Sequence, residues 1–179
     1  MLPARPPALS VTLRDGSRWT IRAIEPEDWR ELQQLHLRLS PRSRRRRFLS
    51  ELRTLPEPLA RRFAAVDFED AAAFVAHRPG EAAIRGVARF ARDAQERELA
   101  DIAVVVEDAF QRLGLGQLLM RRLAEFARER GIRRFRAEVL GENAEVLALF
   151  RRLGFPFEVQ PDLELLRVEV VLPPPQEAS

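Results

Sequence analysis

The sequence contains no cysteine, no tyrosine and no lysine. The lack of cysteine excludes disulfide bonds and a thiol nucleophile. All 30 basic residues are therefore arginine, and the pI of 10.9 partly reflects the high pKa of the guanidinium group. Because the net charge is only +3, this pI is weak evidence for nucleic-acid binding.

Long apolar runs are also absent. No uninterrupted stretch approaches the ~18 apolar residues of a membrane span, and Pro3, Pro6 and Pro7 interrupt the segment where a signal peptide would be apolar. The chain of 179 residues, 46% hydrophobic and 32% charged, has the length and composition of one globular domain. We therefore expect a cytoplasmic protein with a single domain over residues 11–172 and loose segments at 1–10 and 173–179.

The first half of the chain alternates between helical and extended patterns. The apolar spacing predicts one strand at residues 19–23 and then helices at 27–39, 43–55 and 57–65. Three short apolar runs bounded by turn residues are typical of an antiparallel meander. These runs cover residues 71–76, 83–90 and 99–106.

The second half contains the clearest helix, which begins near Leu115 and ends near Gly131. Its apolar residues recur at helical spacing: Leu115, Leu118, Leu119, Leu123, Phe126 and Ala127. A strand at 135–139 follows, and the strand–helix–strand order implies a parallel pair. The remaining elements are a helix from Asn143 to Gly154 and strands at 157–160 and 163–172. The predicted fold is a mixed α/β sheet with an antiparallel N-terminal meander and one parallel crossover near the C-terminal end.

The loop between strand 99–106 and the long helix carries Gly114 and Gly116. Such a loop exposes N–H groups at the positive end of a helix, which suits an anion such as a pyrophosphate. For two glycines alone, a tight connection without a ligand is the favoured interpretation. A dinucleotide-binding fold with Glu138 on the ribose is less consistent, because Leu119 replaces the third glycine of that motif.

This loop resembles the signature of the GNAT acetyltransferase superfamily, Gln/Arg-x-x-Gly-x-Gly/Ala, through Gln111, Gly114 and Gly116. Val104–Val106 resembles the splayed strand that binds pantetheine in that family, and Asn143 with Leu153-Gly154-Phe155 resembles its Asn…Gly-Phe element. The resemblance implies a GNAT-like central sheet and acetyl-CoA as co-substrate. The implied cofactor-binding residues are Val104, Val105, Val106, Gln111, Arg112, Leu113, Gly114, Leu115, Gly116, Gln117, Asn143 and Phe150.

Within the superfamily, several short segments are similar to bacterial protein-lysine acetyltransferase domains. These segments are Thr20-Ile21-Arg22, Pro26-Glu27-Asp28, Leu39-Ser40-Pro41, Arg47-Phe48 and Gly86-Val87-Ala88-Arg89-Phe90. The resemblance extends over about residues 20–170 and makes a protein lysine the preferred acceptor.

The chain departs from the family pattern at three positions. Arg112 stands where many members have Gly, and Leu113 stands where many have Arg. Phe150 replaces a Tyr that is thought to protonate the departing thiolate. Water can take over that protonation, because a thiolate whose conjugate thiol has a pKa near ~8.5 needs little help to leave.

Transfer to an amine also needs a base, because a lysine-like amine with a pKa near ~10.4 is charged at neutral pH. Asp101 is the best candidate, since similar protein acetyltransferases carry a Glu early in this strand. Asp101 could equally pair with an Arg or bond to the backbone at the start of the strand. Glu98 and Glu138 are weaker candidates. Backbone N–H groups of Val104–Val106 would hold the oxyanion.

The remaining chemistry-bearing residues give weaker signals. His36 and His77 are isolated and lack ligand spacing, so we expect no metal site. The basic run of Arg42 and Arg44–Arg47 is typical of a solvated helical face, although in similar proteins this region borders the acceptor cleft. Trp19 and Trp29 are expected to be packing residues.

These observations predict an acetyl-CoA-dependent N-acetyltransferase in which the amine attacks the thioester directly. A small-molecule amine acetyltransferase stays open as an alternative, because acceptor specificity resides in variable loops. A catalytically weak acyl-CoA-binding regulatory module is a second alternative, and an RNA-binding module driven by arginine is a third. Membrane partners are not expected. The sequence does not indicate the acceptor, the acyl chain length or the oligomeric state.

Overall fold

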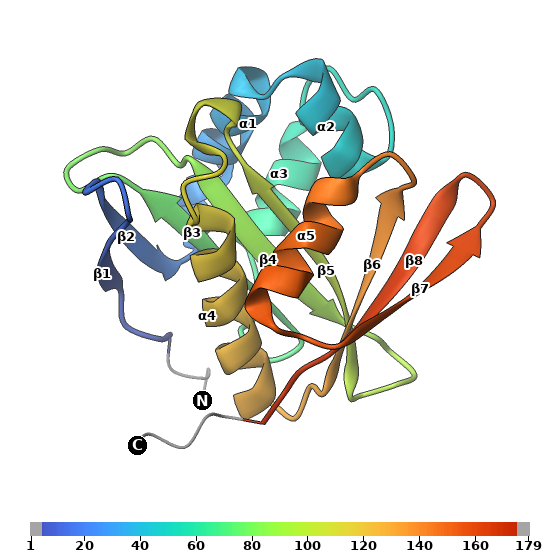
Figure 1. Ribbon diagram of the computed structural model, residues 1–179. Helices are drawn as coiled ribbons and strands as arrows, with labels where there is room; N and C mark the ends of the chain where they lie inside the picture. Colours follow the sequence, from blue (N-terminus) through green and yellow to red (C-terminus); the bar gives the residue numbers. More distant parts are fainter. Residues whose placement is uncertain (1–4, 175–179) are drawn as a thin grey trace.

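The computed structural model describes residues 5–174 and contains an eight-stranded mixed sheet in the order β1-β2-β3-β4-β5-β6-β8-β7 (Figure 1). The strands are β1 Leu9–Thr12, β2 Arg18–Ala23, β3 Ala71–His77, β4 Gly86–Arg92, β5 Leu99–Val106, β6 Arg134–Leu140, β7 Phe157–Asp162 and β8 Leu165–Val171. The predicted mixed α/β fold is confirmed.

Strands β2 to β5 pair in antiparallel fashion in sequence order, as the meander prediction requires. The prediction that residues 1–10 are loose is wrong for Leu9 and Ser10, which begin β1 and pair with β2. This short edge strand is largely exposed and therefore has no alternating apolar signal. Residues 1–4 and 175–179, which belong to the predicted loose ends, lie outside the described residues.

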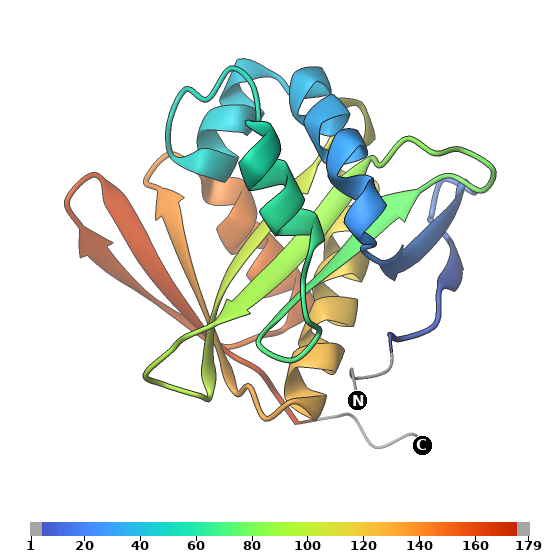
Figure 2. The same ribbon diagram turned by 180° about the vertical axis from the view of Figure 1, so that it is seen from behind.

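The predicted parallel crossover is confirmed by β5, α4 and β6. The α-helices are α1 Trp29–Arg38, α2 Pro41–Phe48, α3 Glu57–Ala64, α4 Leu115–Glu129 and α5 Ala144–Leu153, and the short 3₁₀ turns are η1 Pro26–Asp28 and η2 Asp108–Phe110. Helices α4 and α5 cover one face of the sheet, and α1, α2 and α3 lie on the other (Figures 1 and 2). The sheet is therefore buried on both faces at its centre.

The second helix is shorter than the predicted 43–55. It begins at Pro41, with the Ser40 side chain accepting a hydrogen bond from the Ser43 N–H, and it ends at Phe48. Leu49 adopts a left-handed conformation with φ of 58°, which stops the helix. The expected strand at 83–90 similarly starts only at Gly86.

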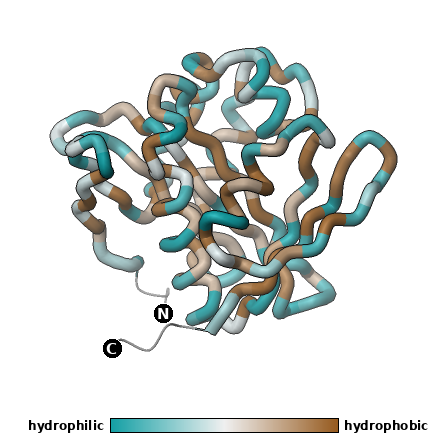
Figure 3. The backbone as a smooth tube through the Cα atoms, in the orientation of Figure 1, coloured by the Kyte–Doolittle hydropathy of each residue, from teal (hydrophilic) through white to brown (hydrophobic). Residues whose placement is uncertain are grey.

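The core lies between the sheet and α4 and is rich in phenylalanine. The Phe126 ring of α4 lies 5.6 Å from Phe74 of β3, and the Phe90 ring of β4 lies 6.4 Å from Phe135 of β6. Trp19 is fully buried, which confirms its packing role. Hydrophobic residues are concentrated in the central strands and hydrophilic residues in the outer loops (Figure 3).

Candidate functional site

A gap opens between β5 and β6. The two strands pair only from Leu99 to Asp101, opposite Arg134 to Arg136, and then diverge (Figure 1). Beyond this point β5 remains paired with β4 alone.

The free edge of β5 in this gap carries backbone polar groups. The Glu107 N–H donates to the Arg85 carbonyl, so antiparallel alternation directs the backbone of Val105 toward β4 and that of Val104 toward the gap. The Val106 carbonyl accepts a hydrogen bond from the Gln111 side chain at 2.9 Å. Val104 therefore offers its N–H and C=O groups to a ligand between the strands.

The loop before α4 has the conformation that an anion site needs. Gly114 is the N-cap of α4 with φ of 91°, and Arg112 also has a positive φ, of 65°. The first N–H groups of a helix have no intrahelical partners, and no side chain caps them here. Within residues 5–174, the backbone N–H groups of Arg112, Leu113 and Gly114 donate no hydrogen bond. These groups lie at the positive end of α4, where they fit a pyrophosphate.

The two glycines of the loop differ in backbone conformation. Glycine is favoured at position 114 because the φ angle there is positive, and residues with a side chain rarely adopt such a conformation. Gly116 has ordinary helical geometry, and an added Cβ would lie 3.8 Å from a methyl group of Val106, an ordinary contact. The Arg112 side chain is 87% exposed and lies 4.0 Å from Glu145, at the rim of the loop.

A hydrogen-bond network ties this loop to α2. The Asp108 carboxylate accepts hydrogen bonds from the Ser40 N–H and hydroxyl, at 2.9 and 2.7 Å, and from the Ser43 hydroxyl at 2.9 Å. Burial opposes the charge of Asp108, yet these hydrogen bonds outweigh it and lower the pKa of the carboxyl. The Gln111 amide donates to both Val106 and Ser43. The Gln111 side chain thus anchors the loop.

Asn143 and Phe150 occupy different environments. Asn143 is the N-cap position of α5, yet its side chain makes no capping hydrogen bond and is only partly buried. Phe150 is fully buried, and its ring lies 6.0 Å from that of Phe157. In the structure Phe150 is a core residue.

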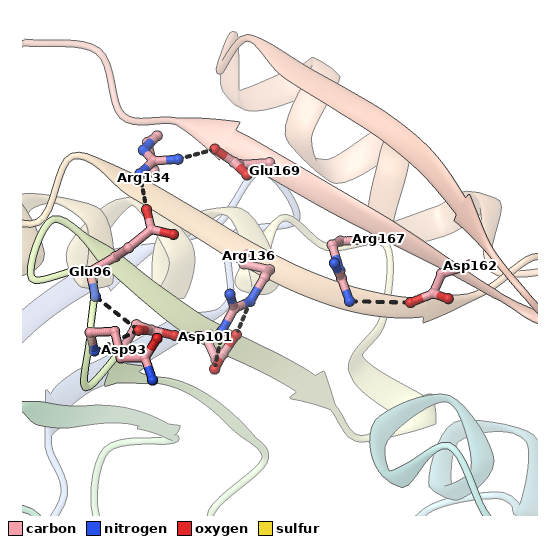
Figure 4. A network of polar contacts seen from close by, with 9 residues as sticks. Asp93, Glu96, Asp101, Arg134, Arg136, Asp162, Arg167 and Glu169 are labelled. Carbon is pink, nitrogen blue, oxygen red and sulfur yellow. Dashed lines mark hydrogen bonds and ion pairs between the residues drawn. The ribbon is translucent and has the colours of Figure 1, made fainter.

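The Asp101 carboxylate lies where β5 and β6 begin to diverge. It accepts hydrogen bonds from Arg136 of β6 at 2.6 and 3.0 Å, and Arg136 also donates to Asp93 at 3.0 Å (Figure 4). The hydrogen bonds that Arg136 donates to Asp101 raise the pKa of Arg136 although burial opposes this, so the guanidinium stays charged. The Asp101 side chain is 57% exposed, which leaves it accessible to solvent.

The opposite face of β5 borders an apolar pocket beneath α1, α2 and α3. Its lining includes Val105 of β5, Leu35 of α1 and Phe63 of α3, together with the arginines Arg47 and Arg89. Sequence reasoning placed Arg47 in a basic run and Arg89 in a matched segment without assigning either to a pocket. The one available signal was Arg89 within the otherwise apolar stretch Val87–Ala91 of β4.

The basic run of α2 is not a uniform solvated face. Arg46 forms a 2.9 Å ion pair with Glu145 of α5, and Arg44 donates to the carbonyls of Leu39 and Arg53. Arg42 and Arg45 are exposed.

The two histidines do not form part of a metal centre. His36 is buried in α1 with Nε2 2.7 Å from the Leu52 carbonyl, and His77 contacts Arg22 and Arg78. Across the described range, no group of three His, Asp or Glu side chains is arranged to hold a metal ion. The same range contains no helix that combines the length and apolar character of a membrane span.

The model of the Acetyltransferase (GNAT) family matches residues 28–155, from the start of α1 to the end of α5. The chain belongs to the GNAT acetyltransferase family. It is an acetyl-CoA-dependent N-acetyltransferase. Acetyl-CoA supplies an acetyl group activated as a thioester.

Individual relatives of this acetyltransferase cover most of its length. It is 34% identical over 153 residues to Acetyltransferase PA5475 of Pseudomonas aeruginosa, which covers 84% of this chain and 82% of that protein. The solved GNAT domain of S. lividans PAT is 30% identical, with a TM-score of 0.85 over 92% of this chain and 97% of that one. Acetyltransferase Pat of Mycolicibacterium smegmatis is 30% identical over 93% of this chain, which spans only 49% of Pat.

Proposed function

We propose that this acetyltransferase moves the acetyl group of acetyl-CoA to a lysine side chain of a protein. The observation that carries the proposal is the match to the GNAT domain of S. lividans PAT over nearly the whole of both chains. The short segments that resemble bacterial protein-lysine acetyltransferase domains support the same acceptor. The cytoplasmic location expected from the sequence stays a prediction.

The cofactor would be held mainly by backbone groups. The N–H groups of Arg112, Leu113 and Gly114 and of the first turn of α4 would bind the pyrophosphate, while Val104 would bind the pantetheine arm within the gap. The Val104 N–H is also the candidate for stabilising negative charge on the acetyl oxygen. Leu115, Gly116 and Gln117 belong to this binding surface through their position in the first turn of α4.

Asp101 is the proposed base for the amine. The pairing with Arg136 fixes the orientation of its carboxylate, while each oxygen keeps a further lone pair for the amine or for a bridging water. The amine then attacks the thioester directly, and the chain contains no cysteine that could carry the acetyl group as a thioester. Phe150 has no proton to give to the leaving thiolate, so water would supply it.

Mass spectrometry can separate the possible acceptors. The purified protein would be incubated with acetyl-CoA and either lysate proteins or a panel of free amines. Acetylated protein lysines without acetylated amines would support the proposal. Acetylation of free amines alone would replace it by a small-molecule acetyltransferase, and CoA binding without any transfer would favour the regulatory module.

Charge variants on α2 add a second test of a protein acceptor. Arg42 and Arg45 are exposed at the N-terminal and middle parts of α2, where they can attract an acidic protein surface. Replacing both by Gln should slow transfer to an acidic protein at low salt and leave transfer to a small neutral amine unchanged. An unchanged rate with the protein acceptor at low salt would remove this role for α2.

A further inference from the structure

Two arginines share the apolar pocket beneath α1, α2 and α3 without a carboxylate partner. Arg47 comes from the end of α2 and Arg89 from the middle of β4. Within residues 5–174, neither guanidinium forms a salt bridge or a hydrogen bond, and the Nε of Arg89 is buried with no partner. By contrast, several other arginines donate hydrogen bonds to a carboxylate or to a backbone carbonyl. These are Arg22, Arg38, Arg44, Arg46 and Arg136.

The lack of a partner is energetically unfavourable. Burial, together with the charge of Arg89, lowers the pKa of Arg47 to about 10, and burial with the charge of Arg62 lowers the pKa of Arg89 to about 10. Both groups are therefore still cationic at neutral pH. Two like charges in an apolar site repel each other and lose hydration, so this arrangement does not stabilise the free protein.

Aromatic rings contact both guanidinium groups, and Phe63 contacts the two of them. The Arg89 group lies 4.2 Å from the centre of the Phe63 ring, and the Arg47 group lies 5.4 Å from the same ring and 4.6 Å from that of Phe48. Cation–π contacts orient a guanidinium but leave its N–H donors unused. The pair is thus ready to bind an anion that accepts several hydrogen bonds.

The pocket adjoins the strand that borders the cofactor gap. Val105 lines it from β5, one residue along from Val104. The cavity has about 30 Å³ of space, enough for a small polar group. Phe63 and Arg89 also line a larger groove of about 460 Å³ that contains Arg62. An acceptor in this groove could therefore reach both the arginine pair and the neighbourhood of the reacting strand.

The groove contains one acidic side chain, and that one is engaged. The Asp67 carboxylate accepts hydrogen bonds from three backbone N–H groups of its own loop, at Glu69, Asp70 and Ala71. Its hydrogen bonds are therefore made to the loop, and within residues 5–174 it forms no ion pair with Arg62 or Arg89.

We propose that Arg47 and Arg89 bind a carboxylate that the acceptor carries close to its reactive amine. A planar guanidinium matches a carboxylate with two parallel hydrogen bonds, and two such groups around one carboxylate would fill all of its acceptor sites. On a protein, the carboxylate is an acidic side chain beside the lysine. On a free amino acid, it is the acceptor's own carboxyl group. The inference rests on the proposed amine acetylation and specifies which amines are accepted.

Matched acceptors test the charge requirement. The first pair is two blocked peptides that differ only in Glu or Gln beside a single lysine, and the second is a free amino acid and its amide. The parent protein should show a KM about tenfold lower for the carboxylate member of at least one pair, equivalent to about 1.4 kcal/mol. Equal KM values within both pairs would overturn the proposal.

Variants then assign the preference to the pocket. Arg89→Met and Arg47→Met should abolish the carboxylate preference while keeping the affinity for acetyl-CoA. Arg133→Met is the control, because Arg133 is exposed, lies outside α2 and is not among the lining residues of the pocket or the groove. Since an unpaired buried charge is removed, Arg89→Met should melt at or above the temperature of the parent. A preference that survives in both pocket variants would overturn the assignment.

The two pairs also separate this inference from the proposed lysine acceptor. A preference for the free amino acid over its amide, with neither peptide acetylated, would support the carboxylate site and reject a protein acceptor. Acetylation of both peptides at equal KM, with no discrimination between amino acid and amide, would support a protein acceptor and reject the carboxylate site.

Discussion

The Asp101 carboxylate accepts hydrogen bonds from the Arg136 guanidinium at the last of the three residue pairs that join β5 to β6. The ion pair lies where the strands begin to separate (Figure 4), near the start of β5, whereas the Gly114 loop follows the end of that strand. The proposed base is therefore also part of the contact that holds the two halves of the sheet together.

Substituting Asp101 should separate these two roles. If Asp101 accepts the amine proton, Asp101→Asn should lower kcat about 100-fold near neutral pH with little change in CoA affinity. The measurement is the pH profile of kcat alongside calorimetric CoA binding. Glu138→Gln is the control, because Glu138 is exposed on the neighbouring strand. A parental profile for Asp101→Asn, with a loss for Glu138→Gln, would move the role of base to Glu138.

The start of α4 should be sensitive to side-chain size once the cofactor approaches. Gly116→Val adds branched bulk at the first turn of α4 and should weaken CoA binding about tenfold or more, about 1.4 kcal/mol. Gly116→Ala is the matched control, because its Cβ has room beside Val106. Calorimetry on both folded variants checks the expectation, and equal parental affinity for the two would place the pyrophosphate elsewhere.

The Asp108 network should contribute to stability and to cofactor binding together. Asp108→Ala removes three hydrogen bonds that join η2 to Ser40 and Ser43 of the α2 region, and we expect a loss of about 1 kcal/mol. For a chain of this size that loss corresponds to a Tm lower by about 2–4 °C. Thermal unfolding with and without CoA measures it, with the exposed Glu51→Ala as control. A lower Tm at unchanged CoA affinity would show that the anchor is purely structural.

The buried His36 should make stability depend on pH. Burial lowers the pKa of His36 below its ordinary value of 6.5, although the hydrogen bond to the Leu52 carbonyl opposes the shift. The unfolded chain thus binds a proton at a higher pH than the folded chain, and stability falls as the pH drops below about 6.5. His36→Gln keeps a donor for Leu52 and cannot titrate, so its Tm should fall less between pH 7.5 and pH 5.5. Identical pH dependence in parent and variant would contradict this assignment.

The local features of the fold followed from the sequence because their causes are local. The apolar spacing of α4, the glycine loop before it and the strand–helix–strand order all depend on neighbouring residues, and each was predicted at nearly its observed position. The end of α2 at Leu49 and the strand β1 were not predicted, because neither depends on a local apolar pattern. A left-handed residue that ends α2 and an exposed strand held by pairing leave no periodic signal.

The sequence by itself determined the family, through Gln111, Gly114 and Gly116 at fixed spacing before a strongly apolar helix. Only the tertiary structure decided the partners of the charged groups. Arg136 lies 35 residues from Asp101, and Arg47 lies 42 residues from Arg89, yet the sheet and α2 bring each pair to one place. Charged side chains carry no periodic signal of their own, so their pairing, or its absence, depends on which elements the hydrophobic core packs side by side.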